Sequence, residues 1–399
     1  MRLPLMLFGF LALGAGVQAA GNDFAQVQAG AGYNFYNSSD GVTVNSPEAN
    51  VSATLDQRTT LTLSYGLDAV SAASFNYDQS KTHEHGSGDH QVGSCQDCHS
   101  PVDALSGASL NYYEQRQFFT LGAEQRLGEG KAKVSWYHSG EHDYRGEAVH
   151  VSWSQDLAGR DTNLTADVAH TSDWVSSSID PAFGAGRYSD QASLALTQLL
   201  DPHSEMRALL DYASNTGYLG DPYAFVACLA CNQASVNGST DPEENPVPNK
   251  VPSLRDRWDL GLGYKRAFPG DSALEASYRF YHDNWGVQAH TIALSWAAQI
   301  STRWGEWVLE PEYRYYTQTR ADFFRNIYAT DQAYMTRDLK LAEYSSHWLG
   351  VDFRGPVTDL LSAEFRYGHY LRMDNLDYSY YFGDGPVNAD TLQFVLTLQ

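Results

Sequence analysis

The sequence predicts an all-β fold, a transmembrane antiparallel β-barrel of about 16 strands with short periplasmic turns and long external loops. Three observations predict this fold. The chain begins with an export signal, it has no later apolar run long enough for a membrane helix, and many of its segments alternate apolar and polar residues between turns.

Residues 1–20 have the pattern of a secretory signal peptide. Arg2 gives a positive start, an apolar stretch follows, and Val17-Gln18-Ala19 supplies a small-residue cleavage site. This stretch is too short to cross a bilayer, and no later apolar run approaches the roughly 20 residues that a membrane helix needs. We therefore expect residues 21–399 to form a single exported barrel domain.

Aromatic residues are abundant, with 26 Tyr, 17 Phe and 9 Trp. In membrane barrels such side chains form girdles at the two membrane interfaces. The net charge of −22 argues against nucleic acid as a partner, because nucleic acids select basic surfaces. These features predict a protein of the bacterial outer membrane, surrounded by outer-membrane lipid.

The C-terminal half shows the clearest alternation. Apolar residues recur at alternate positions of six segments, 258–264, 274–280, 307–315, 349–353, 361–367 and 392–398. Charged residues occupy intervening positions, among them Glu275, Arg279, Glu310, Glu312, Arg314, Asp352, Arg354, Glu364 and Arg366. Because charges are costly in lipid, we expect these residues to face the lumen and to form a cross-strand ion-pair lattice, with ion selectivity as the alternative role.

Turn chemistry predicts the topology. Seven short connections rich in Gly, Pro, Asp and Ser alternate with eight longer ones, which implies sixteen strands. An even strand number places both termini in the periplasm, so the longer connections are external. Two of them contain cysteine, residues 75–101 between the third and fourth strands and residues 219–253 between the ninth and tenth.

The stretch Cys95-Gln-Asp-Cys98-His99 carries the strongest functional signal. A CxxCH motif attaches haem c, since its two thiols form thioethers and its His ligates the iron. A His-rich segment precedes the motif and offers a second axial ligand. The predicted haem c site therefore comprises Cys95, Cys98 and His99 with one of His83, His85 and His90.

Other interpretations remain open, because a second pair, Cys228 and Cys231, lacks the following His. One is a metal site, with four thiolates for zinc or iron, or histidines for copper or zinc. Another is structural disulfides, which suit the oxidising envelope, and the last is a redox-active dithiol. The metal interpretation draws on Cys95, Cys98, Cys228, Cys231, His83, His85, His90 and His99.

Several segments resemble an uncharacterised bacterial outer-membrane family, domain of unknown function 3570. They are Asp-Ala-Val-Ser-Ala-Ala-Ser at 68–74, Asp-Ala-Leu-Ser-Gly-Ala-Ser at 103–109, and the stretches 217–223, 278–286 and 313–324. The resemblance covers most of the mature chain. It implies a barrel and an association with redox maturation proteins, and it supplies no catalytic residues.

No phosphate-binding loop, Gly-x-Ser-x-Gly elbow or HExxH is found, so we do not expect an enzyme. The favoured hypothesis is a component of an envelope redox, electron-transfer or metal-handling system. One haem cannot bridge a bilayer, so periplasmic or extracellular cytochromes would be its partners. The alternatives are a porin-like passive channel whose CxxC pairs are disulfides, and a barrel that captures copper or zinc. We expect His138, His142, His150 and His170 to be hydrogen-bonded residues of the wall or its edges.

Overall fold

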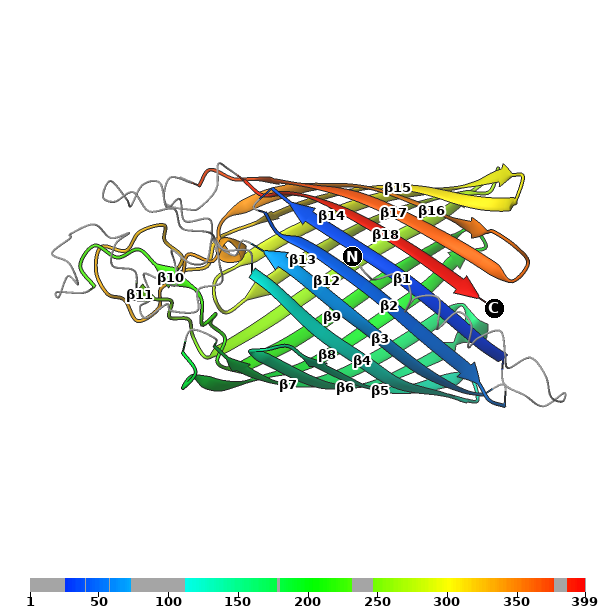
Figure 1. Cartoon of the computed structure of the whole chain (residues 1–399). Helices are drawn as coiled ribbons and strands as arrows, with labels where there is room; N and C mark the ends of the chain where they lie inside the picture. Colours follow the sequence, from blue (N-terminus) through cyan, green and yellow to red (C-terminus); the bar gives the residue numbers. More distant parts are fainter. Residues whose placement is uncertain are drawn as a thin grey trace, which may run out of the picture.

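The computed structural model describes residues 26–39, 41–56, 58–72, 112–177, 180–231, 247–376 and 386–398. Sixteen antiparallel strands form one closed barrel in this part of the chain (Figure 1). The barrel strands are β1 (Gln26–Ser38), β2 (Thr43–Thr54), β3 (Thr59–Ala72), β4 (Tyr112–Leu127), β5 (Gly130–Gly140), β6 (Tyr144–Leu157), β7 (Thr162–Ser176), β8 (Gly184–Asp201), β9 (Ser204–Gly217), β12 (Leu254–Phe268), β13 (Ser272–Asp283), β14 (Gln288–Thr302), β15 (Gly305–Gln318), β16 (Tyr344–Pro356), β17 (Leu361–Met373) and β18 (Asn388–Leu398).

The barrel closes by pairing its first and last strands. Each strand pairs with its neighbours along the chain, and β1 pairs with β18 from Ala29↔Leu398 to Ser38↔Ala389. The short strands β10 (Phe225–Val226) and β11 (Val247–Pro248) form a separate sheet in the connection between β9 and β12. Closure leaves no unpaired strand edge, which a lipid environment requires. The predicted fold class and strand number are confirmed.

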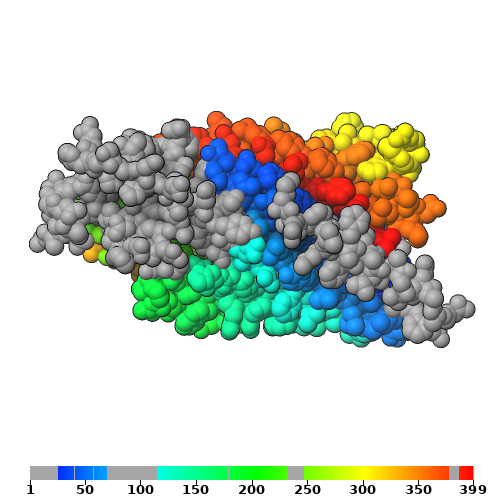
Figure 2. All heavy atoms as spheres, in the orientation of Figure 1, coloured from blue at the N-terminus to red at the C-terminus, as the bar shows by residue number. Residues whose placement is uncertain are grey.

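The outward face of the barrel is apolar, as the alternation predicts. On β12, Trp258, Leu260 and Leu262 are 49%, 48% and 50% exposed in the isolated chain. Figure 2 shows the outer side of the wall, where the side chains of neighbouring strands form a continuous surface. An apolar surface of this extent is stable when lipid covers it. Among the described residues, no helix is long and apolar enough to cross a membrane.

The connections at the two ends of the barrel differ in length. Seven short turns join the strands at the periplasmic end, as predicted. At the external end the connections after β3, β9, β15 and β17 are long, whereas those after β1, β5 and β13 are as short as the periplasmic turns. The described residues of the stretch 219–253 lie between β9 and β12. Residues 75–101 lie outside the described residues.

Candidate functional site: a bridged mouth above a polar lumen

Two external connections meet beyond the strand ends. We call residues 218–231, 247–253 and 319–343 the mouth bridge. The Tyr328 amide donates to the Ala227 carbonyl at 3.0 Å, and the Leu229 amide donates to the Tyr328 carbonyl at 2.9 Å. Lys250 and Met335 exchange two further backbone bonds of 2.8 and 2.7 Å. Connections rooted on β9–β12 and β15–β16 therefore join through backbone hydrogen bonds.

A small buried cluster holds the two halves of the mouth bridge together. Val226 and Met335 are fully buried there, and Cys228 and Tyr328 are 4% exposed. The Tyr328 hydroxyl accepts from the Thr336 amide at 2.7 Å and lies within hydrogen-bond reach of the Phe323 and Thr336 carbonyls. Burial raises the pKa of Tyr328, so the hydroxyl keeps its proton over the physiological pH range.

The mouth bridge is anchored to strands on nearly opposite sides of the barrel. The Tyr223 hydroxyl donates to the Asp143 carboxylate in the turn between β5 and β6. The Arg372 guanidinium, on β17, donates to the Leu339 carbonyl at 2.9 Å. Around the ring, these anchor points are six pairings apart in one direction (β5 to β17 through β1) and nine in the other (β6 to β17 through β12). Figure 1 shows β10 and β11 beyond the external end of the barrel.

A buried carboxylate organises the rim where residues 319–343 are seated. Asp283 has no exposed side-chain surface and accepts from Arg255 at 2.6 Å and from the Tyr281 hydroxyl at 2.6 Å. It also accepts from the amides of Trp285 and Val287, which fixes the tight turn between β13 and β14. Five bonds to one carboxylate, counting the second contact from Arg255, satisfy its charge without water.

The turn presents an apolar surface to the mouth bridge. Trp285 and Val287 pack with Phe324 and Leu341, and the Asp322 amide donates to the Trp285 carbonyl at 2.9 Å. Gly286 has a φ of +89°, and a Cβ there would lie 2.4 Å from the Asp322 carboxylate. Only glycine suits both the backbone and this close approach. Residues 319–343, the longest fully described external connection, therefore pack on the turn that ends the stretch 278–286.

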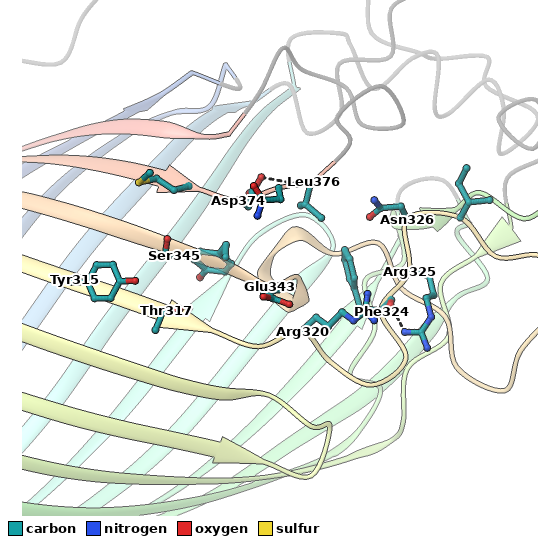
Figure 3. Close-up of a pocket in the computed structure, with 14 residues that line it drawn as sticks. Tyr315, Thr317, Arg320, Phe324, Arg325, Asn326, Glu343, Ser345, Asp374 and Leu376 are labelled. Carbon is teal, nitrogen blue, oxygen red and sulfur yellow. Dashed lines mark hydrogen bonds between the residues drawn. The ribbon is translucent and has the colours of Figure 1, made fainter.

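A pocket of about 580 Å³ lies where residues 319–343 meet the ends of β15, β16 and β17 (Figure 3). Arg320 and Glu343 line it at the ends of residues 319–343, and Asp374 lines it just beyond the end of β17. Asp374 is held by Arg372 at 2.6 Å, and both side chains are almost fully buried. That ion pair belongs to the anchoring of the mouth bridge, because Arg372 also binds the Leu339 carbonyl.

The lumen wall carries the predicted ion-pair lattice. Arg354 pairs with Glu310 at 2.8 Å, and Arg366 pairs with Asp352 at 3.1 Å. Further along the same arc of the wall, Arg279 on β13 and Asp259 on β12 are 2.7 Å apart. The pairs connect neighbouring strands, so they stiffen the wall while leaving it polar. Glu275 and Glu364 join the same lattice through Lys265 and Arg366. Within the described residues, Glu312 and Arg314 form no ion pair, and the Arg314 guanidinium lies 5.4 Å from the centre of the Trp348 ring.

The structure resolves one of the open questions about the cysteines. Cys228 and Cys231 form a disulfide with a Cα–Cα separation of 5.5 Å, so this pair closes on itself. A four-thiolate metal site would first need this bond to be reduced. Haem c stays a prediction, because all the residues of its predicted site lie outside the described residues. They are Cys95, Cys98, His99, His83, His85 and His90. No group of three or more His, Cys, Asp or Glu able to hold a metal occurs in the described part of the chain.

Of the wall histidines, His150 and His170 are hydrogen-bonded to aspartates, as expected. His138 lies 3.5 Å from Glu147, and His170 lies 2.7 Å from Asp190, each across a strand pair. His150 is 3.1 Å from Asp167 on the lumen side.

The sequence interpretation missed the role of residues 319–343. The only signal was the resemblance segment 313–324, whose aromatic and charged residues did not indicate which connection it would contact.

A family model described as "Protein of unknown function (DUF3570)" matches residues 11–188 and 182–394. No curated protein matches the chain. A solved structure described as "Bacterial polysaccharide outer membrane secretin" is similar, with a TM-score of 0.51, 9% identity and coverage of 95% of this chain and 99% of that chain. CdiB from Acinetobacter baumannii also matches, with a TM-score of 0.48, 8% identity and coverage of 92% of this chain and 60% of that chain. OccK5 from Pseudomonas aeruginosa matches with a TM-score of 0.42, 7% identity and coverage of 95% of this chain and 99% of that chain. The protein is an outer-membrane β-barrel embedded in outer-membrane lipid.

Proposed function

Because the chain belongs to the DUF3570 family, which comes without an activity, we propose its function from the geometry. The protein is a porin-like channel for small polar solutes, with an external mouth restricted by the mouth bridge. The observation that carries this proposal is the closed ring of sixteen strands with a charged, polar inner wall. Barrels of this size leave an aqueous interior unless loops fill it.

The mouth bridge supports a restricted channel rather than a wide one. Its two anchor points, Asp143 and Arg372, lie on nearly opposite sides of the ring. The Cys228–Cys231 disulfide sits in the buried cluster that joins its two halves. This disulfide favours a structural role for the second cysteine pair, because both sulfurs are bonded and Cys228 is almost fully buried.

Solute uptake into proteoliposomes tests the channel. Liposomes that contain the folded protein are expected to swell in solutions of small neutral and charged solutes, more slowly as solute size increases. Folding is checked by the heat-dependent change in gel mobility that closed barrels show. If correctly folded protein admitted no solute of any size, the channel proposal would be wrong.

A haem-bearing barrel is the second candidate, favoured by the CxxCH motif in the connection between β3 and β4. Topology places that connection at the external end, the same end as the mouth bridge. Cys95 and Cys98 would hold haem c covalently and His99 would ligate its iron, which would supply one-electron transfer to partner cytochromes.

Haem staining on a denaturing gel separates the two candidates. In a host competent for cytochrome c maturation, the haem hypothesis expects a stained band at the size of this chain that is lost in Cys95→Ser/Cys98→Ser. The matched control is Cys228→Ser/Cys231→Ser, which leaves the CxxCH motif intact and should keep the stain. An unstained native chain, with a known cytochrome stained in the same cells, would rule the haem out.

A further inference from the structure

We propose that the lumen wall carries a binding subsite for a neutral saccharide where β2, β1, β18, β17 and β16 lie side by side. The inference names the substrate class of the channel, so it rests on the proposed function. A pocket of about 320 Å³ occupies this part of the wall. Its volume lies at the lower end of the roughly 300–1,000 Å³ that small-molecule sites occupy, which suits one or two sugar rings.

The strand register places the lining side chains on the inner face. Tyr33 pairs with Phe394, and these residues are 37% and 44% exposed on the lipid side. The next pair along the same strands, Asn34 and Gln393, therefore points into the lumen. Gln393 lies opposite Arg366 on β17, so the two amides and the guanidinium form one continuous inward row.

A tryptophan supplies the apolar surface of the pocket. Leu349 is 51% exposed to lipid, so the adjacent Trp348 faces the lumen. Its indole covers Gly368 on the neighbouring strand, where an added Cβ would come within 1.9 Å of the ring. Glycine at this position allows the indole to lie on the wall beside Tyr36, instead of projecting across the lumen.

These groups match the surface of a sugar. Pyranose rings present C–H faces that stack on aromatic rings, and their hydroxyls both donate and accept hydrogen bonds. Carboxamide side chains also do both. Within the described residues, the side chains of Asn34 and Gln393 make no hydrogen bond to another protein group, so their donors and acceptors remain available to a ligand or to water.

The charge of the pocket favours a neutral ligand over an anion. Among the described residues that line it, Arg366 carries the one charged side chain, and the Arg314 guanidinium lies 5.4 Å from the centre of the Trp348 ring. Its guanidinium already pairs with Asp352 at 3.1 Å and with Glu364 at 3.2 Å. A cation balanced by two carboxylates attracts an anionic solute weakly, but its remaining N–H groups can still donate to a hydroxyl.

Calorimetric titration of the full chain in detergent tests the subsite. The probes are glucose, galactose, xylose and maltotriose, with glucose 6-phosphate and a polyether of similar mass as comparisons. At least one neutral saccharide is expected to bind, and to bind about tenfold more weakly to Trp348→Ala, a loss of about 1.4 kcal/mol. Gly368→Ala, which forces the indole off the wall, and Gln393→Leu should weaken binding in the same direction.

Phe118→Ala is the matched control. Phe118 covers Gly66 on a different part of the inner wall in the same way, with an added Cβ 2.1 Å from its ring, but it does not line the pocket. It should leave saccharide affinity unchanged. The subsite is disproved if no neutral saccharide binds, if glucose 6-phosphate or the polyether binds as well, or if all variants bind like the native chain. Solute uptake without saccharide binding would support the channel proposal and contradict the subsite. Saccharide binding without solute uptake would support the subsite and contradict the channel proposal.

Discussion

Replacing residues 320–342 with a short Gly/Ser turn is expected to raise single-channel conductance in planar bilayers several-fold. These residues form half of the mouth bridge and carry its anchor to Arg372. Without them, the other half loses its backbone partners at Tyr328 and Met335. The flanking strands β15 and β16 pair directly with each other, so the barrel should still close. An aqueous lumen would then open to the outside.

The control for this experiment is Lys250→Ala. Lys250 lies in the mouth bridge, but its ion pair with Asp331 is exposed, so its loss should leave the bridge in place. Conductance of that variant is expected to equal that of the native chain. An excised variant that folds and conducts like the native protein would show that the mouth bridge does not restrict the channel.

Asp283→Ala is expected to lower the free energy of unfolding by about 3–5 kcal/mol, the usual cost of removing one partner of a buried ion pair. The substitution leaves the Arg255 guanidinium, which also lies 4.5 Å from the centre of the Trp285 ring, without its carboxylate. It also removes the acceptor of two turn amides. Urea titration in detergent, followed by tryptophan fluorescence, measures the effect.

Asp331→Ala provides the comparison, because Asp331 forms an ion pair of the same length, 2.6 Å, at an exposed site. Its side chain is 56% exposed, against 0% for Asp283, so the loss should stay below about 1 kcal/mol. Asp283→Asn should fall between the two, since it keeps acceptors but loses the charge. Equal effects of Asp283→Ala and Asp331→Ala would show that the rim carboxylate does not organise this end of the barrel.

Local patterns allowed the barrel to be predicted in detail. Alternation places residues on two faces without any knowledge of their partners, because successive side chains of a strand point in opposite directions. The number of turns then gives the number of strands. Because that number is even, both chain termini lie on the periplasmic side. For the same reason the lumen charges were identified correctly, from Glu275 on β13 to Arg366 on β17.

The candidate sites depend on partners that are distant along the chain. The sequence shows Cys228 and Cys231 as a pair, but the disulfide is one of several chemically reasonable outcomes, and only the folded connection selects it. Nothing local links Cys228 to Tyr328, or Trp348 to Gly368.

By itself the sequence determined the class of protein, its membrane, the number of strands and the face on which each strand residue lies. These properties follow from period-two patterning and turn chemistry, which act over a few residues. The tertiary structure alone decided that two external connections join into a mouth bridge, and that Asn34, Gln393 and Arg366 share one row of the lumen wall. Those contacts require closure of the ring, which brings the first and last strands together and which no local pattern encodes.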